Sequence, residues 1–398
     1  MNTVEDDVRE KVPWARLALG FAVSLAMALY AICAVPVLAV AVLLLLDACT
    51  LQGRLFALAV VLGAPAPVLL WLAARATKRR RGLLTAGAAC LAPAAVLLGV
   101  DYALAADGQS RPGSPVRSCF AGSAEFHRAS PANLVPEMDQ LLLGTRVMPA
   151  MDRLLDRAGA DELRSGVREV YGEMRGDPDF ERLGSVLDQS YRDILFDRRD
   201  VGHFYEYVPE APAGKRVPVV VFLHGSLGNF RGYLWVWKAV ADRHGVAVVA
   251  PTFGAGRWDR PGGEEAIERV LRRCVADPRM DPSRIYLAGL SNGGLGVCRA
   301  AGRRPEAWRG LILVSPVVDE RALFTDGFRA ACGGKPVLIL HGADDDRVPV
   351  RCIRDAAEAM RLRGMRVECD VLEGRTHFLF FSDREAVEER IGPWLERN

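Results

Sequence analysis

A single serine lies between two glycines in the segment GLSNG, residues 289–293, directly after the apolar run RIYLA. Glycines two positions before and after Ser291 allow a sharp turn from strand into helix, which exposes the serine hydroxyl. That hydroxyl is a useful nucleophile only if a base removes its proton. Because Gly fills 38 of 398 positions, the motif is weak evidence alone, and its partners must be found elsewhere.

The base is sought among six histidines. His377, in EGRTHFLF, follows the last apolar run on a short loop, where a catalytic base is expected. The other five lie at strand ends, where packing or hydrogen bonding is favoured, or in or near predicted helices or an early strand: His127, His203, His224, His244 and His341. We therefore predict that His377 is the base.

An acid and two oxyanion donors complete the predicted constellation. Asp344, Asp345 and Asp346 directly follow the apolar run LIL-HG, and one carboxylate there would hold the imidazole in its useful tautomer. This chemistry alone does not show which of the three aspartates is the acid. The backbone N–H groups of Ser226 and Asn292 are predicted to stabilise the negative charge of a tetrahedral intermediate.

Strands and helices alternate after residue 200, which favours a mostly parallel sheet covered on both faces. The predicted strands are residues 203–209, 217–225, 246–251, 284–289, 310–316, 335–342 and 366–374. In such sheets the reactive groups lie on loops beyond the carboxyl ends of the strands. The candidate residues all follow predicted strands.

Residues 200–398 resemble the alpha/beta-hydrolase superfamily, in particular its esterases and predicted peptidases. The resemblance is carried by YVPEAPAGKRVPVVVFLHGSLGN, DPRMDPSRIYLAGLSNGG, LILHGADDDRVP and GRTHF, which are similar to polyhydroxybutyrate depolymerase-like, dienelactone hydrolase-like and prolyl oligopeptidase-type domains. The chain order Ser, Asp, His is the order of this superfamily. The pattern HG-x-x-D-x-x-VP implies that Asp345 is the acid.

The resemblance implies hydrolysis of carboxylic esters through an acyl-enzyme on Ser291. A peptidase or acyltransferase with the same triad, and a catalytically silent binding module, are the alternatives. The substrate is expected to be an acyl ester or a peptide. Since neither a zinc-site spacing nor an H-E-x-x-H motif occurs in the sequence, no metal or cofactor is expected.

Three apolar runs near the amino terminus predict transmembrane helices: residues 17–46, 55–72 and 83–100. The first is longer than a bilayer core of about 30 Å requires for a helix. The second is short and contains Pro65 and Pro67, so a re-entrant hairpin is its alternative. The chain is therefore expected to bind a lipid bilayer.

Basic residues predict the orientation of these spans. The cluster at residues 75–81, between the second and third spans, is expected to stay in the cytoplasm. The chain after about residue 107 then lies outside the cytoplasm, as part of a multi-pass protein of the cell membrane. An oxidising compartment would permit up to three disulfides among the six later cysteines, and buried free thiols are the alternative.

We divide the chain into a membrane region (1–106), a linker with amphipathic helices (107–199) and an alpha/beta-hydrolase domain (200–398). The linker is residues 107–118, and helices are expected from there to about residue 198. We favour a structural collar for these helices over a cap on the pocket. The segment between the strands at 310–316 and 335–342 is too short for a large lid, which favours an open cleft unless the helices before residue 200 close over it.

Composition excludes one class of partner and suggests residues near the substrate. With 51 basic and 49 acidic residues, the net charge of +2 offers no general attraction for nucleic acid. Some aromatic residues near the first loops are expected to line an acyl pocket, although the two at 235 and 237 are better explained as helix core. These residues are Phe230, Tyr233, Trp235, Trp237, Phe253 and Trp258.

Overall fold

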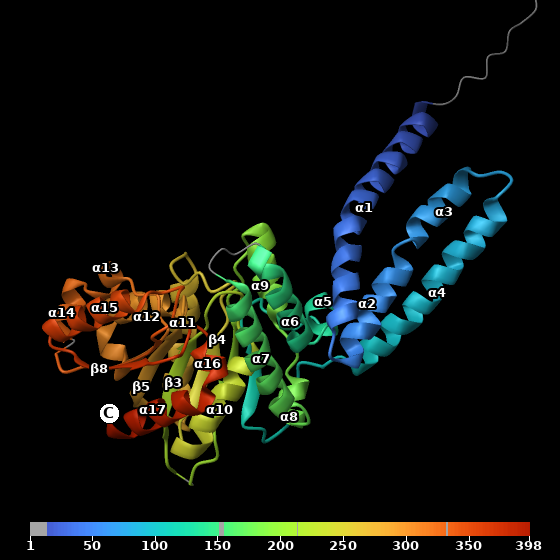
Figure 1. Cartoon of the computed structure of the whole chain (residues 1–398). Helices are drawn as coiled ribbons and strands as arrows, with labels where there is room; N and C mark the ends of the chain where they lie inside the picture. Colours follow the sequence, from blue (N-terminus) through green and yellow to red (C-terminus); the bar gives the residue numbers. More distant parts are fainter. Residues whose placement is uncertain (1–13, 151–154, 213, 332) are drawn as a thin grey trace, which may run out of the picture. The chain divides into compact units, whose positions relative to one another are not determined.

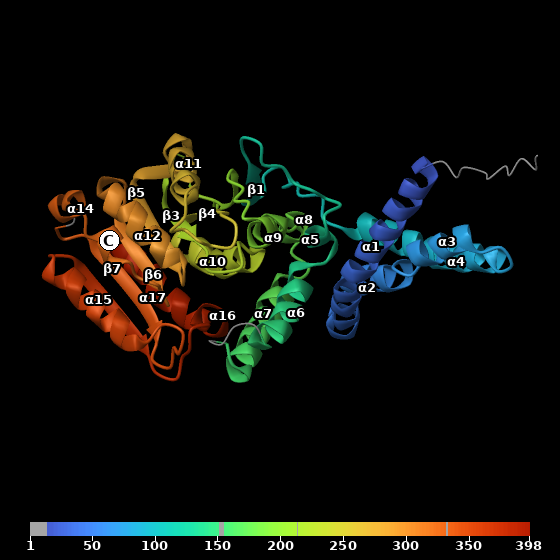
Figure 2. The same ribbon diagram turned by 90° about the horizontal axis from the view of Figure 1, so that it is seen from above.

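The computed structural model describes residues 14–150, 155–212, 214–331 and 333–398 (Figures 1 and 2). By its internal contacts the chain divides into two compact units, Met1–Ala103 and Leu104–Asn398. The helical segment before residue 200 therefore belongs to the same unit as the sheet.

The first unit consists of long apolar helices. They are α1 (Trp14–Asp47), α2 (Leu51–Gly63), α3 (Ala66–Arg75) and α4 (Arg80–Leu104). Three stretches are long and apolar enough to cross a membrane: Leu17–Asp47, Leu51–Arg75 and Arg80–Leu104. Each predicted span is present and extends further than its uncharged run.

The second stretch is interrupted rather than folded back. α3 continues in the general direction of α2 after a break at Ala64 and Pro65 (Figure 1), so among the described residues the re-entrant alternative is wrong. A break of this kind exposes backbone carbonyls, which are costly to leave unpaired in lipid. The Tyr30 hydroxyl of α1 donates to the Ala64 carbonyl over 2.7 Å and satisfies one of them.

The second unit is built on an eight-stranded sheet with the order β1-β2-β4-β3-β5-β6-β7-β8. The strands are β1 (Val116–Phe120), β2 (His203–Tyr207), β3 (Val217–Leu223), β4 (Ala247–Pro251), β5 (Met280–Leu290), β6 (Gly310–Val314), β7 (Pro336–Gly342) and β8 (Arg366–Leu372). β2 pairs antiparallel with β1 and β4, and all other pairs are parallel. The seven predicted strands are present.

β1 was not predicted from the sequence, because residues 116–120 straddle the predicted linker and the start of the predicted helices. The strand pairs along its whole length with β2, from Val116 opposite Tyr207 to Phe120 opposite His203. Its sequence VRSCF has a weak alternation, with only Val116 buried. Pairing with an available edge of the sheet therefore determines its conformation more than its own side chains do.

Side chains of the central strands alternate between two apolar layers. In β3, Val220 and Phe222 join one core, while Val219, Val221 and Leu223 join the other. The first layer lies under α10 (Arg231–His244) and α17 (Arg384–Arg397), and the second under α11 (Gly263–Ala276), α12 (Gly293–Arg303) and α15 (Val350–Leu362) (Figure 1). Strands buried on both faces become continuous apolar runs, which explains why the sequence located them.

Short elements connect the layers. They are α13 (Glu320–Leu323), α14 (Asp326–Ala331), α16 (Leu379–Ser382) and the 3₁₀ turns η1 (Met148–Ala150) and η2 (Pro305–Ala307).

The cysteines at 33, 49, 90, 119, 274, 298, 352 and 369 are free thiols. Cys332 lies outside the described residues. For the described later cysteines the disulfide alternative is wrong, and the alternative of buried free thiols holds fully only for Cys274 and Cys298.

Five helices, which we call the cap, lie between β1 and β2 in the sequence. They are α5 (Pro131–Leu134), α6 (Glu137–Val147), α7 (Arg157–Met174), α8 (Pro178–Arg182) and α9 (Leu187–Phe196). α7 begins at an N-cap, where the Asp156 side chain accepts from the Gly159 N–H. Val167, Val170 and Met174 of α7 join the same apolar layer as α10, which packs the cap onto the sheet domain.

A buried ion pair also fastens the cap. The Glu137 side chain is fully buried, and its Oε2 accepts from Tyr171 Oη over 2.7 Å, from Arg231 N over 3.1 Å and from Arg231 Nε over 3.2 Å. Arg231 Nη1 also donates to the carbonyl of Phe180 over 3.0 Å. Arg231 of the sheet domain thus contacts α6 and α8 directly, and Glu137 links this cluster to Tyr171 of α7.

Breaking this pair should destabilise the second unit strongly. Arg231→Met leaves the Glu137 carboxylate buried without its cation, and such losses cost about 3–5 kcal/mol. The measurement is chemical unfolding of the detergent-solubilised chain. Lys238→Ala removes an exposed i,i+4 partner of Asp242, with side chains 29% and 43% exposed, and should cost under about 1 kcal/mol. Equal effects of the two changes would contradict the role of the buried pair.

Candidate active site

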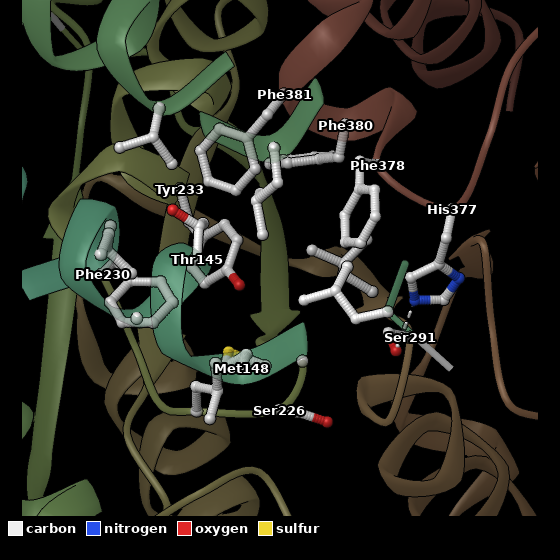
Figure 3. Close-up of a pocket in the computed structure, with 18 of the residues that line it drawn as sticks. Thr145, Met148, Ser226, Phe230, Tyr233, Ser291, His377, Phe378, Phe380 and Phe381 are labelled. Atoms are coloured by element: carbon white, nitrogen blue, oxygen red, sulfur yellow. Dashed lines mark hydrogen bonds between the residues drawn. The ribbon is translucent and has the colours of Figure 1, made fainter. Parts of the chain in front are cut away.

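The predicted catalytic residues follow three strands on one side of the sheet. Ser291 follows β5, Asp345 follows β7 and His377 follows β8, and these strands lie in the order β5-β6-β7-β8. Parallel strands present their carboxyl ends at one edge, so residues distant in sequence meet there. Figure 3 shows Ser291 and His377 side by side at this edge.

The turn at Ser291 requires the two glycines that flank it. Ser291 has φ of 52°, a left-handed conformation that costs a non-glycine residue about 1–3 kcal/mol. A Cβ at Gly289 would lie 2.6 Å from the backbone of Gly293, and one at Gly293 would overlap the carbonyl oxygen of Leu223 in β3. The Ser291 N–H donates to the Val314 carbonyl over 3.0 Å, which ties the turn to β6.

A chain of hydrogen bonds joins the three side chains. His377 Nε2 lies 3.0 Å from Ser291 Oγ, and His377 Nδ1 lies 2.8 Å from Asp345 Oδ2. An ionised carboxylate can only accept, so Nδ1 carries the proton and Nε2 presents its lone pair to the serine hydroxyl. The arrangement can remove the serine proton and return it to a leaving group.

Asp345 is the aspartate of the three that contacts His377, while Asp344 and Asp346 are exposed. Burial raises the pKa of Asp345, but the hydrogen bond and charge of His377 and the Val348 N–H outweigh it, and the net pKa is lowered. Asp345 Oδ1 accepts from Val348 N over 2.8 Å. The carboxylate is therefore held ionised and oriented at neutral pH.

His341 lies next to Asp345 and holds the loop that follows it. Its Nε2 donates to the Val348 carbonyl over 2.9 Å and lies 3.7 Å from Asp345 Oδ2. Burial lowers the pKa of His341, which favours its neutral form. The structure thus places this histidine in hydrogen bonding at a strand end, as predicted, and next to the acid, which the sequence did not indicate.

The predicted oxyanion donors face each other across the carboxyl ends of β3 and β5. Asn292 Nδ2 donates to Ser226 Oγ over 2.9 Å. Within the described ranges, neither the Ser226 N–H nor the Asn292 N–H donates to a protein acceptor. Both are therefore available to a ligand oxygen beside Ser291.

A buried histidine shapes the loop that carries Ser226. His224 Nδ1 donates to the Gly225 carbonyl over 2.8 Å, and its Nε2 accepts from the Phe253 N–H over 3.2 Å. Trp258 Nε1 donates to the His224 carbonyl over 2.8 Å. A neutral imidazole suits both contacts of its ring, because it offers one donor and one acceptor.

A cavity of about 250 Å³ adjoins Ser291 (Figure 3). Its walls come from the cap, from the loops after β3 and β5, and from the segment after His377. The lining residues from the cap are Gln140, Leu141, Gly144, Thr145, Met148, Leu155, Leu163, Val167, Leu187, Tyr191 and Ile194. The cap therefore forms one side of the cavity in addition to packing on the domain, so the preference for a purely structural collar was wrong.

Aromatic residues form much of the opposite side. Phe230 and Tyr233 line the cavity, as the sequence suggested for some of its aromatic candidates. Of the other candidates, Trp235 packs edge-on against Phe180 at 5.0 Å between ring centroids, and the remaining ones are buried in the core: Trp237, Phe253 and Trp258. Packing within the protein, rather than contact with the cavity, therefore accounts for these four aromatic residues.

The lining residues that were not singled out from the sequence include three phenylalanines: Phe378, Phe380 and Phe381. They follow His377 directly, in THFLFF. The cluster of aromatic residues beside the predicted base was the available signal. α7 packs against this segment, since Thr376 Oγ1 donates to Glu162 Oε2 over 2.7 Å.

Known proteins resemble this part of the chain. The prolyl oligopeptidase family matches residues 265–333. A poly(3-hydroxybutyrate) depolymerase of Ralstonia pickettii is 32% identical over 23% of this chain and 24% of its own length. Poly(3-hydroxyalkanoate) depolymerase C of Paucimonas lemoignei is 28% identical over 35% of this chain and 43% of its own length. The chain thus spans less than half of these relatives.

Among solved structures, Est1E from Butyrivibrio proteoclasticus is 20% identical, with a TM-score of 0.39, over 49% of this chain and 94% of that one. The family match, the two depolymerases and the sheet topology support an alpha/beta-hydrolase segment of the esterase and peptidase-like kind in the second half of this chain.

Two buried histidines near the site predict a pH dependence of stability. Burial, with a smaller effect of His224, lowers the pKa of His203 to about 3, and burial lowers that of His224 to about 4. Both pKa values lie below the value of about 6.5 for an unfolded histidine. Between pH 6.5 and 4 the unfolded chain therefore binds more protons, and stability must fall as the pH falls.

Each histidine should contribute a slope of about 1.4 kcal/mol per pH unit below pH 6. Chemical unfolding of wild type and His203→Gln at pH 7, 6, 5 and 4.5 measures it. His203→Gln should be less stable at pH 7, because His203 contacts Thr252 Oγ1 at 2.7 Å, but its slope should be smaller. An unchanged slope would show that His203 titrates normally in the folded chain.

Proposed function

We propose that the chain is a membrane-anchored serine hydrolase that cleaves carboxylic esters, with Ser291 as nucleophile, His377 as base and Asp345 as acid. The observation that carries this proposal is the pair of contacts of His377, 3.0 Å to Ser291 Oγ and 2.8 Å to Asp345 Oδ2. The curated relatives that act on polyesters support an ester as the substrate.

The geometry supports a two-step reaction. Ser291 Oγ bonds to the carbonyl carbon while its proton moves to His377 Nε2, and the carbonyl oxygen takes negative charge between the N–H groups of Ser226 and Asn292. The ester C–O bond then breaks, and the leaving oxygen takes the proton from His377. Water, deprotonated by His377 Nε2, attacks the acyl carbon, and the bond from that carbon to Ser291 Oγ breaks. The carboxylic acid leaves, and Ser291 Oγ takes the proton back from His377 Nε2.

Ser291→Ala should lower hydrolysis of p-nitrophenyl butyrate by about 10³-fold or more, because the covalent route is lost. A fluorophosphonate probe should label wild type but not the variant. Ser315→Ala is the matched control: Ser315 also follows a strand with positive φ, 41°, and lies outside the cavity lining. Retained hydrolysis or labelling in Ser291→Ala would refute the assignment. A stable fold without labelling of wild type would favour a silent binding module.

Peptide hydrolysis is a second candidate, because the prolyl oligopeptidase family matches residues 265–333. The same triad serves both reactions, and acyl transfer differs only in the acceptor that attacks the acyl-enzyme. A panel of peptides, esters and acyl acceptors offered to wild type and Ser291→Ala separates the three. A peptide activity lost with Ser291, and exceeding the ester activity, would make peptides the substrate.

We also propose that the hydrolase domain lies outside the cytoplasm. The basic residues 75–81 follow the second membrane stretch and favour a cytoplasmic loop, which leaves the chain after α4 on the other side. In the accompanying test, Gln109→Cys and Thr77→Cys are placed in a background that lacks the other exposed thiols. Both positions are exposed.

A membrane-impermeant maleimide should label Gln109→Cys in intact cells, and Thr77→Cys only after the membrane is permeabilised. Both variants lie a few residues from a membrane stretch, so each controls for the reactivity of the other. Labelling of Thr77→Cys alone in intact cells would reverse the orientation.

A further inference from the structure

The wall that α6 contributes to the cavity has a gap at one position. The lining residues of α6 and of the turn after it are Gln140, Leu141, Gly144, Thr145 and Met148. They recur at a spacing of three to four residues and form one stripe of the helix. Gly144 lies within this stripe, so its missing side chain would point toward the cavity.

The space next to Gly144 is empty. A Cβ built at this position meets no atom within 4 Å, and Gly144 does not have positive φ. A glycine inside a helix costs roughly 0.5–1 kcal/mol relative to alanine, and neither backbone geometry nor close packing requires one here. The structural consequence of this glycine is an open volume.

The polar groups of this wall are already paired within the protein. Thr145 Oγ1 donates to the Leu142 carbonyl over 2.8 Å. Gln140 Nε2 donates to the Ala132 and Val135 carbonyls over 2.8 and 2.6 Å, and its Oε1 accepts from Tyr191 Oη. The neighbouring lining residues are apolar, so a ligand here gains from burying carbon rather than from polar recognition.

The reaction determines which end of an ester enters this space. The leaving oxygen must receive the proton of His377 Nε2, so the leaving group lies on the His377 side of Ser291. Figure 3 shows His377 and Ser291 at one end of the cavity and Phe230, Tyr233 and Phe381 at the other. A chain that extends from Ser291 away from His377 belongs to the acyl group.

We propose that the cavity binds an unbranched aliphatic acyl chain and that Gly144 determines the length of chain it accepts. This inference rests on the proposed ester hydrolysis and names its substrate class. If each carbon takes roughly the 30 Å³ that a water molecule occupies in the liquid, a cavity of about 250 Å³ holds on the order of eight carbons. Medium-chain acyl esters are the substrates that fit.

The test measures kcat/KM of the full-length chain in detergent for p-nitrophenyl esters from acetyl to dodecanoyl. Wild type should improve roughly fourfold per methylene up to about eight carbons. Gly144→Leu should lower the octanoyl-to-acetyl ratio by at least about tenfold and move the optimum to shorter chains, and Gly144→Ala should have a smaller effect.

Gly172→Leu is the matched control. Gly172 also lies within a cap helix, is exposed, has no atom within 4 Å of an added Cβ and lies outside the cavity lining. Its octanoyl-to-acetyl ratio should equal that of wild type. A series of alkyl acetates tests the choice of the acyl end: a length effect of Gly144→Leu in that series, and not in the acyl series, would overturn the assignment. An equal effect on all acyl lengths would overturn the role of Gly144.

A binding experiment distinguishes a failure of this inference from a failure of the proposed function. Ser291→Ala protein should bind methyl octanoate more tightly than methyl acetate in isothermal titration, and adding Gly144→Leu should remove most of the difference. If wild type hydrolyses no ester while this binding pattern holds, the cavity assignment stands and ester hydrolysis fails. If Ser291→Ala shows no preference for the longer ester, the cavity assignment fails whatever the activity.

Discussion

The site depends on one constraint: three side chains far apart in sequence can form a continuous hydrogen-bond chain only if their strands end at a common edge. Ser291 and His377 are 86 residues apart, and His377 and Asp345 are 32 apart. The parallel register of β5 to β8 brings their following loops together. The two apolar layers that bury both faces of the sheet hold this register, because a slip of one residue would exchange the two faces.

The loops at this edge of the sheet have strained backbone conformations and are held by hydrogen bonds to neighbouring strands and loops. Ser291 and Ser315 follow adjacent strands with positive φ, and the backbone N–H groups of both donate to carbonyls of a neighbouring strand. The acid loop is tied to the histidine loop, since the Asp344 N–H donates to the Arg375 carbonyl over 2.9 Å. These backbone contacts give the candidate catalytic side chains a fixed geometry that their own rotamers would not maintain.

The cap gives this site its shape. It is fastened by an apolar interface, by the buried pair of Glu137 and Arg231, and by the bond from Thr376 to Glu162 next to His377. Walls from two distant parts of the sequence therefore enclose the space beside Ser291. Apolar walls lower the local dielectric, which would strengthen the electrostatic interactions of the proposed triad and of the proposed oxyanion donors.

Much of this protein follows from its sequence, because periodicity and composition reflect burial. The three stretches of the first unit are apolar enough to cross a membrane, and central strands such as β3, β4 and β6 are apolar because both faces of the sheet are covered there. The order of Ser291, Asp345 and His377 after successive strands located the candidate site. Choosing Asp345 from three adjacent aspartates needed the resemblance to alpha/beta-hydrolases, since local spacing does not distinguish them.

Only the tertiary structure decided what the cap does and where the cavity lies. The amphipathic pattern of α6, α7 and α9 shows that each has a buried face but not what that face contacts, so a collar and a cap look the same in sequence. β1 depends on an edge offered by β2, whose paired residues lie 83 to 91 positions away along the chain, from Phe120 opposite His203 to Val116 opposite Tyr207, and not on its own alternation. Such features arise from contacts between distant segments, whose energies no local pattern contains.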